Sequence, residues 1–402
     1  MKLSLVFPMF WGREKKKVYE EDDFFYDHPT AVDDDGTLPP LFKSMEILKD
    51  KDFDIIVVAG ANADSYQQKV ETAVKNLINR QKRDFSVCVF SYSELKKLHE
   101  FLKRHNKGHL IDTIQLKGYS PLRNACFVVA NILNSDIAVS IDDDIAFTDE
   151  NHITTIKNTM KTVMLNEEVL ALCGPYLCER DTILLPIKET ATSVFYNNLE
   201  VMNAAFRKYI IEGDRYKKVP FSIMGNIAVD RDFYTKIPLD PVLSRGEDSD
   251  WVMNANIFGY NFIMDNQLIV KHLPAARPYP AWRPLREDIR RYLYIHKKIE
   301  KSFESSKTRR INPDDYKPFP GEFFDPNIFM DKVGKACMAM AIEYLSVGEK
   351  ENAKQALHNI YLAKFGETIE DPFIAYLDFQ AKWEEMMIFL SDNRDEIKYL
   401  LW

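Results

Sequence analysis

The sequence predicts an α/β protein with a mixed, mainly parallel sheet flanked by helices, followed by a helical C-terminal region. Three observations indicate this. Apolar strand-like runs alternate with amphipathic helical stretches over the first third of the chain, which is typical of a parallel sheet covered on both faces. Beyond residue 286 the patterns are helical around one Pro-rich break. Carboxylates directly follow an apolar run at 136–141, where such sheets bind ligands.

The expected elements follow in chain order. In the first third, strands are predicted over 3–10, 53–60, 85–91, 112–117 and 136–141, and helices over 41–50, 64–81, 95–105 and 122–133. The next part is less regular, with helices over 152–165 and 188–212 and strands over 168–174, 224–229 and 261–270. The segment "HLPAARPYPAWRPLRED", 272–288, is rich in Pro, aromatic residues and Arg, which indicates a covering loop.

The C-terminal part is predicted to contain helices over 286–305, 327–347, 350–364 and 371–391. We therefore expect two domains, a ligand-binding and catalytic domain over 1–285 and a helical region over 286–402. A segment near residue 350 could form a helical hairpin of the tetratricopeptide kind, but no repeat at that period is visible. The role of the helical region stays open.

Composition excludes some classes of protein. The 402 residues carry a net charge of -8, which argues against a nucleic-acid binder, because phosphate backbones are held by basic surfaces. No apolar run reaches membrane-spanning length, and the opening lacks a signal-peptide pattern. We expect a cytoplasmic protein, with its five scattered cysteines reduced. The oligomeric state cannot be derived from these residues.

The most informative segment is "NSDIAVSIDDDIAFTDE", in which Asp142, Asp143 and Asp144 follow the apolar run. Carboxylates side by side repel one another, so a positive group is expected against them. An equal run, 33–35, lies in the polar stretch "TAVDDDGTLPP" and is expected to be a solvated loop. A strand-terminal Asp-x-Asp suits Mg²⁺ or Mn²⁺ that bridges carboxylates to diphosphate oxygens. A capped strand end is the plainer alternative.

Two motifs flank the acidic turn. Arg123 and Asn124 stand at a predicted helix start one helix upstream, where the helix dipole and the guanidinium suit a phosphate or the acidic cluster itself. Downstream, "SRGEDSDW" places Glu247 and Asp248 at another helix start. One of them would be a general base, with Asp250 competing for that role. Plain helix capping is the alternative.

The strand "NQLIVKHLP" ends near His272. A lone histidine is more often a satisfied polar residue than a ligand. An imidazole beside carboxylates, however, points to Mn²⁺ or a similar transition ion. His272 is therefore a candidate third metal ligand.

Taken together, the motifs resemble a glycosyltransferase of the GT-A fold, family 2 group. The resemblance covers roughly residues 1–285 and rests on segments that occur in the family's order. They are "LVFPMF", "IIVVAGANADS", "GYSPLRNACFVVANILNSDIAVSIDDD", "MGNIAVDRDFY", "RGEDSDW" and "VKHLP". Two departures put the contacts to the donor base in question: Met9 follows the first-strand Pro, and about two dozen residues starting at Gly12 are inserted before the first helix.

This resemblance implies an enzyme that transfers a sugar from a UDP- or GDP-sugar to a hydroxyl of a sugar, glycan or small acceptor. It implies roles for residues of this sequence, as follows: Asp248 or Glu247 as catalytic base; Asp142, Asp144 and His272 as ligands of Mn²⁺ or Mg²⁺; Pro8, Asn62, Asp64, Arg123, Asn124, Asp142 and Asp143 at the donor; Gly225, Asn226 and Trp251 at the acceptor; and Arg277, Trp282 and Arg283 in a loop that closes over the diphosphate.

Other functions remain open from the sequence alone. A carboxylate base favours inversion at the anomeric carbon, but the opening strand, the late His and the helical C-terminal part also look like mannosylglycerate synthase, a retaining transferase. A phosphatase of the haloacid dehalogenase type also uses a strand-end Asp-x-Asp, but this chain has Ala146 where that family has Thr or Val. A binding module for Ca²⁺ or sugar lacks the Gly of a calcium loop. A transferase that binds donor without turnover is harder to dismiss.

Overall fold

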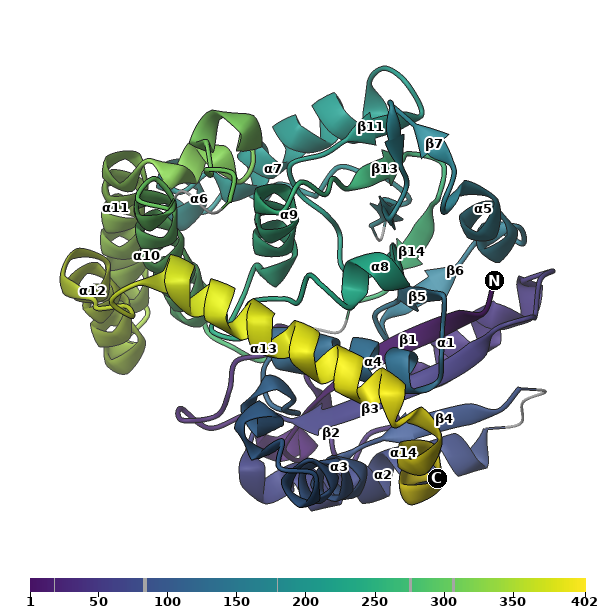
Figure 1. Ribbon diagram of the computed structural model, residues 1–402. Helices are drawn as coiled ribbons and strands as arrows, with labels where there is room; N and C mark the ends of the chain where they lie inside the picture. The colour runs from purple at the N-terminus through teal and green to yellow at the C-terminus, as the bar shows by residue number, and fades with distance from the viewer. Residues whose placement is uncertain (18, 82–84, 179, 275–276, 306–307) are drawn as a thin grey trace.

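A computed structural model describes the chain except residues 18, 82–84, 179, 275–276 and 306–307. Its centre is a mixed sheet in the order β11-β13-β9-β12-β5-β1-β3-β4, with β2 paired to β1 (Figure 1). The strands of this sheet are β1 (Leu3–Gly12), β2 (Thr30–Ala31), β3 (Asp54–Ala61), β4 (Val87–Phe90), β5 (Ile137–Ser140), β9 (Ala171–Cys173), β11 (Tyr216–Lys218), β12 (Ile227–Asp230) and β13 (Ile263–Asp265).

The half of the sheet that comes first along the chain is parallel. β1 pairs in parallel with β3 on one side and β5 on the other, and β3 pairs in parallel with β4. Every residue of β1 is buried, as expected for a continuous apolar strand covered on both faces. β12 then runs antiparallel to β5 and β9. The predicted fold class, a mixed and mainly parallel sheet flanked by helices with a helical C-terminal region, is confirmed.

A second, smaller sheet continues directly from the acidic turn. Its order is β10-β14-β6, with β10 (Tyr176–Leu177), β14 (Val270–His272) and β6 (Ile145–Phe147). β6 begins directly after the three aspartates. It pairs antiparallel with β14, so that Ile145 stands opposite His272. This register holds the histidine at the carboxyl end of β5. A separate hairpin joins β7 (Val163–Met164) and β8 (Glu167–Glu168).

Helices cover the main sheet and form the C-terminal part (Figure 1). Their bounds are α1 (Leu38–Ser44), α2 (Gln67–Arg80), α3 (Tyr92–Arg104), α4 (Tyr119–Ile132), α5 (His152–Thr159), α6 (Ala191–Phe195), α7 (Asn198–Phe206), α8 (Arg231–Tyr234), α9 (Glu247–Ile257), α10 (Trp282–Ser302), α11 (Pro326–Ser346), α12 (Lys350–Phe365), α13 (Pro372–Asp392) and α14 (Arg394–Leu401). Among the described residues, no helix combines the length and apolarity that a membrane crossing requires.

The C-terminal helices pack back onto the first part of the chain. α13 contacts α4 and α10, and in Figure 1 it runs as a long yellow helix past α4 towards α14. The indole of Trp402 donates to the carbonyl of Val89 in β4 at 3.0 Å. One continuous buried apolar cluster extends from Val6 to Leu401. The expected division of the chain at residue 285 stays a prediction.

Several predicted elements differ from the structure. The strand predicted over 112–117 is absent; a 3₁₀ helix, Gly108–Thr113, takes its first part. The following backbone crosses β3 closely, since a Cβ on Gly60 would lie 1.9 Å from the Leu116 carbonyl oxygen. That oxygen accepts a 3.4 Å hydrogen bond from the Gln67 side chain. The Gln67 side chain thus provides the hydrogen bond that a neighbouring β-strand would otherwise provide to this carbonyl.

Two further predictions merged elements that the chain keeps separate. The helix predicted over 188–212 is divided into α6, α7 and a π turn at Arg207–Ile211, and the strand predicted over 261–270 is two strands in different sheets. The segment 272–288, predicted as a covering loop, is helical from Trp282 onward. Trp282 and Arg283 begin α10 and are only 8% exposed each. Pro284 does not prevent this, because it lies in the first turn of the helix, where proline is tolerated.

Candidate active site

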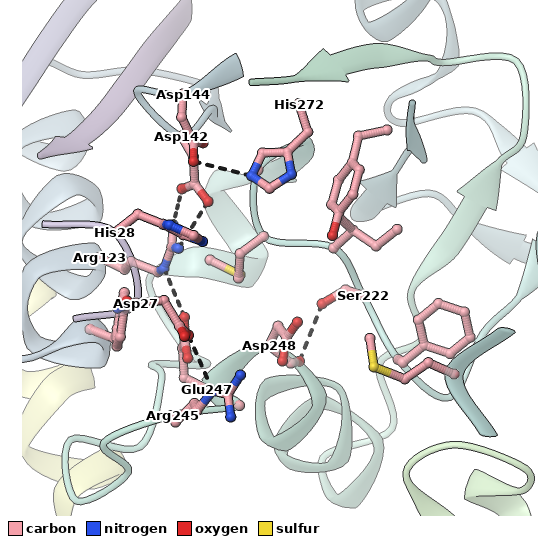
Figure 2. Close-up of a pocket in the computed structure, with 18 of the residues that line it drawn as sticks. Asp27, His28, Arg123, Asp142, Asp144, Ser222, Arg245, Glu247, Asp248 and His272 are labelled. Atoms are coloured by element: carbon pink, nitrogen blue, oxygen red, sulfur yellow. Dashed lines mark hydrogen bonds and ion pairs between the residues drawn. The ribbon is translucent and has the colours of Figure 1, made fainter. Parts of the chain in front are cut away.

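A cavity of about 280 Å³ opens at the carboxyl end of β5 and brings the two predicted motifs together (Figure 2). The acidic turn forms one wall, and the first turn of α9 forms the other. Its lining contains the following residues singled out from the sequence: Arg123, Asp142, Asp143, Asp144, Gly225, Glu247, Asp248, His272 and Arg277. The topology therefore places them where an open α/β sheet binds ligands.

Arg123, in the first turns of α4, joins the two motifs. Its guanidinium donates to both carboxylate oxygens of Asp142, at 2.6 and 3.2 Å, and through Nε to Glu247 at 3.1 Å. Burial would lower the pKa of Arg123, but the charges of Asp142 and Glu247 raise it above its usual value. The positive group expected against the acidic run is thus present, and it serves as the cluster's own counter-charge.

The middle residue of the acidic turn has a different environment. Asp143 accepts a hydrogen bond from the Thr37 hydroxyl at 3.0 Å. Burial, followed by the charges of Asp144 and Asp142, raises its pKa well above the usual value for an aspartate. The carboxylates of Asp142 and Asp144 repel that of Asp143, and a bound cation would reduce this repulsion.

Asp144 and His272 form a pair on the other side of the turn. His272 Nε2 lies 3.1 Å from Asp144 Oδ2, and the imidazole lies against the Tyr176 ring with 4.6 Å between centroids. Burial would lower the pKa of His272, but the hydrogen bond to Asp144 and the charges of Asp144 and Asp142 raise it overall. The backbone N–H of Leu273 donates to the Asp144 carbonyl at 2.7 Å, which fixes the turn against β14.

The predicted metal ligands fit a divalent cation in part. The second carboxylate oxygen of Asp144, Oδ1, is buried and has no hydrogen-bond partner among the described residues. An orphaned carboxylate oxygen beside an imidazole suits Mn²⁺. Asp142, by contrast, is engaged by Arg123, and the described part of the chain holds no cluster of three or more His, Cys, Asp or Glu side chains spaced for a metal. Asp144 and His272 would hold the cation, with the remaining positions left to ligand oxygens and water.

The opposite wall begins at a tight turn before α9. Gly246 has φ +71°, and a Cβ there would lie 1.9 Å from Nη1 of Arg291. Only glycine meets both demands, the left-handed backbone and the close approach of the guanidinium. Burial raises the pKa of Glu247 to about 7. The positive charge of Arg123 lowers this pKa in part, and the negative charge of Asp248 raises it further.

Asp248 is the less constrained carboxylate of this wall. It is half-buried, and its Oδ1 accepts from the N–H of Ser249 at 2.7 Å. Figure 2 shows its carboxylate beside Ser222, whose hydroxyl donates to the Asp248 carbonyl at 3.2 Å. No described cation forms an ion pair with it, whereas Glu247 is held by Arg123. Burial raises the pKa of Asp248 above its usual value, which suits a group that must accept a proton.

Other residues singled out from the sequence lie away from this cavity. None of the following lines it: Pro8, Asn62, Asp64, Asn124, Asn226 and Trp251. Trp251 corrects the expectation of an acceptor contact: it is fully buried, its ring stacks on Phe127 at 5.4 Å, and its Nε1 donates to the Ile237 carbonyl. Trp251 follows Glu247 by four residues, one turn further along the same side of α9, and at that depth Phe233 and Phe262 also pack against its ring.

The remaining members of that set contact other parts of the fold. Asn124 exchanges hydrogen bonds with the backbone of Leu239, and Asn226 donates to the Leu268 carbonyl at 2.6 Å. Asn62 is buried, and its carbonyl accepts from the backbone of Phe24 in the inserted segment. Pro8 lies inside β1. Asp64 pairs with Lys117 at the surface, at 2.7 Å.

The proposed covering loop is only partly at the cavity. Arg277 lines it, and its Nε lies 3.3 Å from Asp27 Oδ1. Trp282 instead donates from Nε1 to the Asn352 side chain at 2.9 Å, and Arg283 donates to the Asp23 carbonyl at 3.3 Å. These two residues attach α10 to α12 and to the inserted segment, so neither reaches the cavity. Their role in closure stays a prediction.

Sequence reasoning missed several residues of the cavity. Asp27 and His28 come from the segment inserted after β1, and Asp27 binds Arg245 Nε at 3.1 Å. Arg245 in turn lies 3.0 Å from Asp288 of α10, and Arg291 also lines the cavity. Arg245 stands next to the Gly-Glu-Asp motif, which was a usable signal. The others come from segments with no motif of their own.

Comparisons with known proteins give fold likeness only. No family model matches the chain, and no curated protein matches it. Among solved structures, the chain is similar to a mannosyltransferase from Pyrobaculum calidifontis in complex with GDP-Man and Mn²⁺, at 14% identity and TM-score 0.45, over 97% of this chain and 86% of that one. It is also similar to glucosyl-3-phosphoglycerate synthase from Mycobacterium tuberculosis in complex with Mn²⁺ and UDP-glucose, at 13% identity and TM-score 0.35, over 73% and 77%. A third similar structure is a mycobacterial protein, at 13% identity and TM-score 0.38, over 72% and 71%.

Proposed function

We propose that the protein is a metal-dependent glycosyltransferase of the GT-A type that moves a sugar from a nucleotide-sugar donor to an acceptor hydroxyl. One observation carries the proposal: a strand-end acidic turn, a histidine and an unpaired helix-start aspartate face one another across a single cavity. The turn and His272 suit a cation and a diphosphate. Asp248, on the opposite wall, suits an attacking hydroxyl.

Each wall has its own task in this proposal. Bound between Asp144 and His272, Mn²⁺ or Mg²⁺ would supply Lewis-acid neutralisation of charge on the departing nucleoside diphosphate. Arg245 and Arg277 bring further positive charge to the same cavity, and both are currently paired with Asp27. Arg123 would keep the acidic turn and the α9 motif in register through its two carboxylate partners.

Asp248 is proposed as the base that removes the proton from the acceptor hydroxyl. Its elevated pKa favours proton uptake: burial raises this pKa more than the charges of Arg291 and Arg123 lower it. A base that activates the acceptor directly favours inversion of the anomeric carbon. Gly225 lines the cavity beside the acidic turn, where a Cβ would lie 3.2 Å from the Ile145 side chain, and the acceptor would pass beside it.

The test is donor turnover. The protein is incubated with Mn²⁺ and either UDP-glucose or GDP-mannose, with water supplying the hydroxyl that takes the sugar, and release of the nucleoside diphosphate is measured. Release that needs Mn²⁺ and falls sharply in Asp248→Asn supports the proposal. Asp395→Asn, an exposed aspartate of α14, is the matched control and should leave release unchanged. Equal release in wild type and Asp248→Asn would remove Asp248 from the mechanism.

A further inference from the structure

A second and larger cavity adjoins the candidate active site. Its volume is about 1230 Å³, against about 280 Å³ for the first. The two share part of their walls, including Tyr176, Met202 and His272. The proposed chemistry uses groups of the smaller cavity only. The larger volume exceeds the roughly 300 to 1,000 Å³ that is typical of sites for drug-sized molecules, and it has no role so far.

The walls of the larger cavity are apolar and come from two distant parts of the chain. Leu184, Leu185 and Leu199 come from the segment before and at the start of α7, and Met340 and Tyr344 come from α11. The leucines are half-buried or exposed rather than sealed in the core. Such a surface gains free energy when an apolar group covers it.

Charged residues of this cavity are found at its two ends. Arg180, Glu343 and Glu349 are exposed and belong to the outer rim. Arg245, Arg277 and Asp288 belong to the wall shared with the candidate active site. A molecule that fits this pattern has a polar end at the acidic turn and an apolar portion that extends towards α11.

We infer that the larger cavity is the binding site for an alkyl or aryl group carried by the acceptor. This inference rests on the proposed function and specifies its acceptor: a hydroxylated head, such as a sugar, joined to an apolar substituent. The head would stand near Asp248, and the substituent would lie against Leu184 and the end of α11. It also gives the C-terminal helices a task, because α11 supplies one wall of the subsite.

The inference is tested with two probes that share one head group, n-octyl β-D-glucopyranoside below its micellar concentration and methyl β-D-glucopyranoside. Both are titrated calorimetrically into the full-length protein. Because each buried methylene favours binding about fourfold, burial of only two of them makes the octyl compound bind at least about tenfold tighter. Equal affinity of the two probes, or no saturable binding of the octyl compound, would overturn the inference.

Variants locate the binding. Leu184→Asp puts a charge on the apolar wall and should reduce the preference for the octyl compound to less than about threefold. Val347→Asp also puts a charge on the cavity lining. Val347 is 67% exposed, so the fold should tolerate this change. Ile342→Asp, 69% exposed on α11 outside the cavity lining, is the matched control and should keep the preference. A preference unchanged in both Leu184→Asp and Val347→Asp would place the probe elsewhere and contradict the inference.

A parallel titration of UDP and GDP with Mn²⁺ separates the two proposals. Nucleotide binding without an octyl preference would refute the apolar subsite and leave the transferase proposal standing. An octyl preference that depends on Leu184, without binding of either nucleotide, would refute the transferase and leave an apolar ligand site.

Discussion

The guanidinium of Arg123 binds both carboxylate oxygens of Asp142, at 2.6 and 3.2 Å. The same guanidinium reaches Glu247 on the other side of the cavity. A planar fork of donors can serve two carboxylates in this way, which an ammonium group cannot reproduce with the same geometry. Arg123 thus determines the spacing between the acidic turn and the start of α9.

Replacement of Arg123 by Met should destabilise the protein strongly. Arg123 is 3% exposed, and its removal leaves Asp142 and Glu247 without their cation. Breaking a buried pair by removal of one partner costs roughly 3 to 5 kcal/mol. Urea unfolding measures the change in the free energy of unfolding. A loss below 1 kcal/mol would show that the two carboxylates find other partners, and the spacing role would then be wrong.

The proposed base gives a kinetic prediction. Asp248→Asn keeps the size of the side chain and removes its ability to accept a proton, so kcat should fall by about 10²- to 10⁴-fold. The affinity for nucleoside diphosphate and Mn²⁺ should change little, because Asp248 lies across the cavity from the acidic turn. A fall in nucleotide affinity with unchanged kcat would instead assign Asp248 to donor binding.

The glycine before α9 should be intolerant of a side chain. Gly246→Ala places a Cβ 1.9 Å from Nη1 of Arg291 at a residue with φ +71°, which should cost about 1 to 3 kcal/mol of stability. Gly334→Ala is the control. Gly334 lies within α11 with no atom within 4 Å of the added Cβ, so that change should stabilise by about 0.5 to 1 kcal/mol. Thermal unfolding of both variants compares the two effects, and equal shifts would contradict the geometry at Gly246.

A buried lysine connects α10 to the helix of the proposed base. Lys298 is fully buried and binds Asp240 at 2.8 Å and Asp250 of α9 at 2.9 Å. Burial, opposed by Lys298, raises the pKa of Asp250 to about 6. A folded-state pKa above the unfolded value of about 3.9 favours folding at low pH. The stability due to Asp250 is therefore complete below about pH 4 and is lost as pH rises through about 6.

Lys298→Met should make the stability of the protein depend more steeply on pH. Without the ammonium, which lowers the pKa of Asp250, the carboxyl of Asp250 becomes harder to ionise, so the variant should lose little stability near pH 4 and roughly 3 to 5 kcal/mol near pH 8. Lys301→Met changes a half-buried lysine on the same helix that is paired with the exposed Glu304, and it should lose less than about 1 kcal/mol at either pH. Urea unfolding at both pH values tests this. A pH-independent loss in Lys298→Met would contradict the ion cluster.

The sequence predicted the parallel half of the fold because its strands are continuous apolar runs separated by amphipathic helices. The acidic turn, Arg123 and the α9 carboxylates were also identified, since each stands at the end of such an element. The run at Asp33–Asp35 was correctly interpreted as an exposed loop. Strand-end and helix-start positions carry this information because topology brings them to one edge of the sheet.

Other features depend on long-range contacts that no local pattern records. The resemblance implied an acceptor contact for Trp251, but Phe127, Phe233 and Phe262 pack against its ring in the core. Asp27 and Arg245 form an ion pair between the inserted segment and the α9 turn, 218 residues apart in sequence. The larger cavity likewise combines α11 with residues near 184, and neither segment has a motif that points to the other.

The most direct test of the account is calorimetric titration of UDP and GDP into metal-stripped protein, with and without Mn²⁺, for wild type and Asp144→Asn. We predict that one nucleotide binds, that binding requires Mn²⁺, and that Asp144→Asn weakens it strongly. Absence of binding by both nucleotides to folded protein with Mn²⁺, or binding that is the same without the metal and in Asp144→Asn, would contradict the assignment of the acidic turn to a donor and metal site.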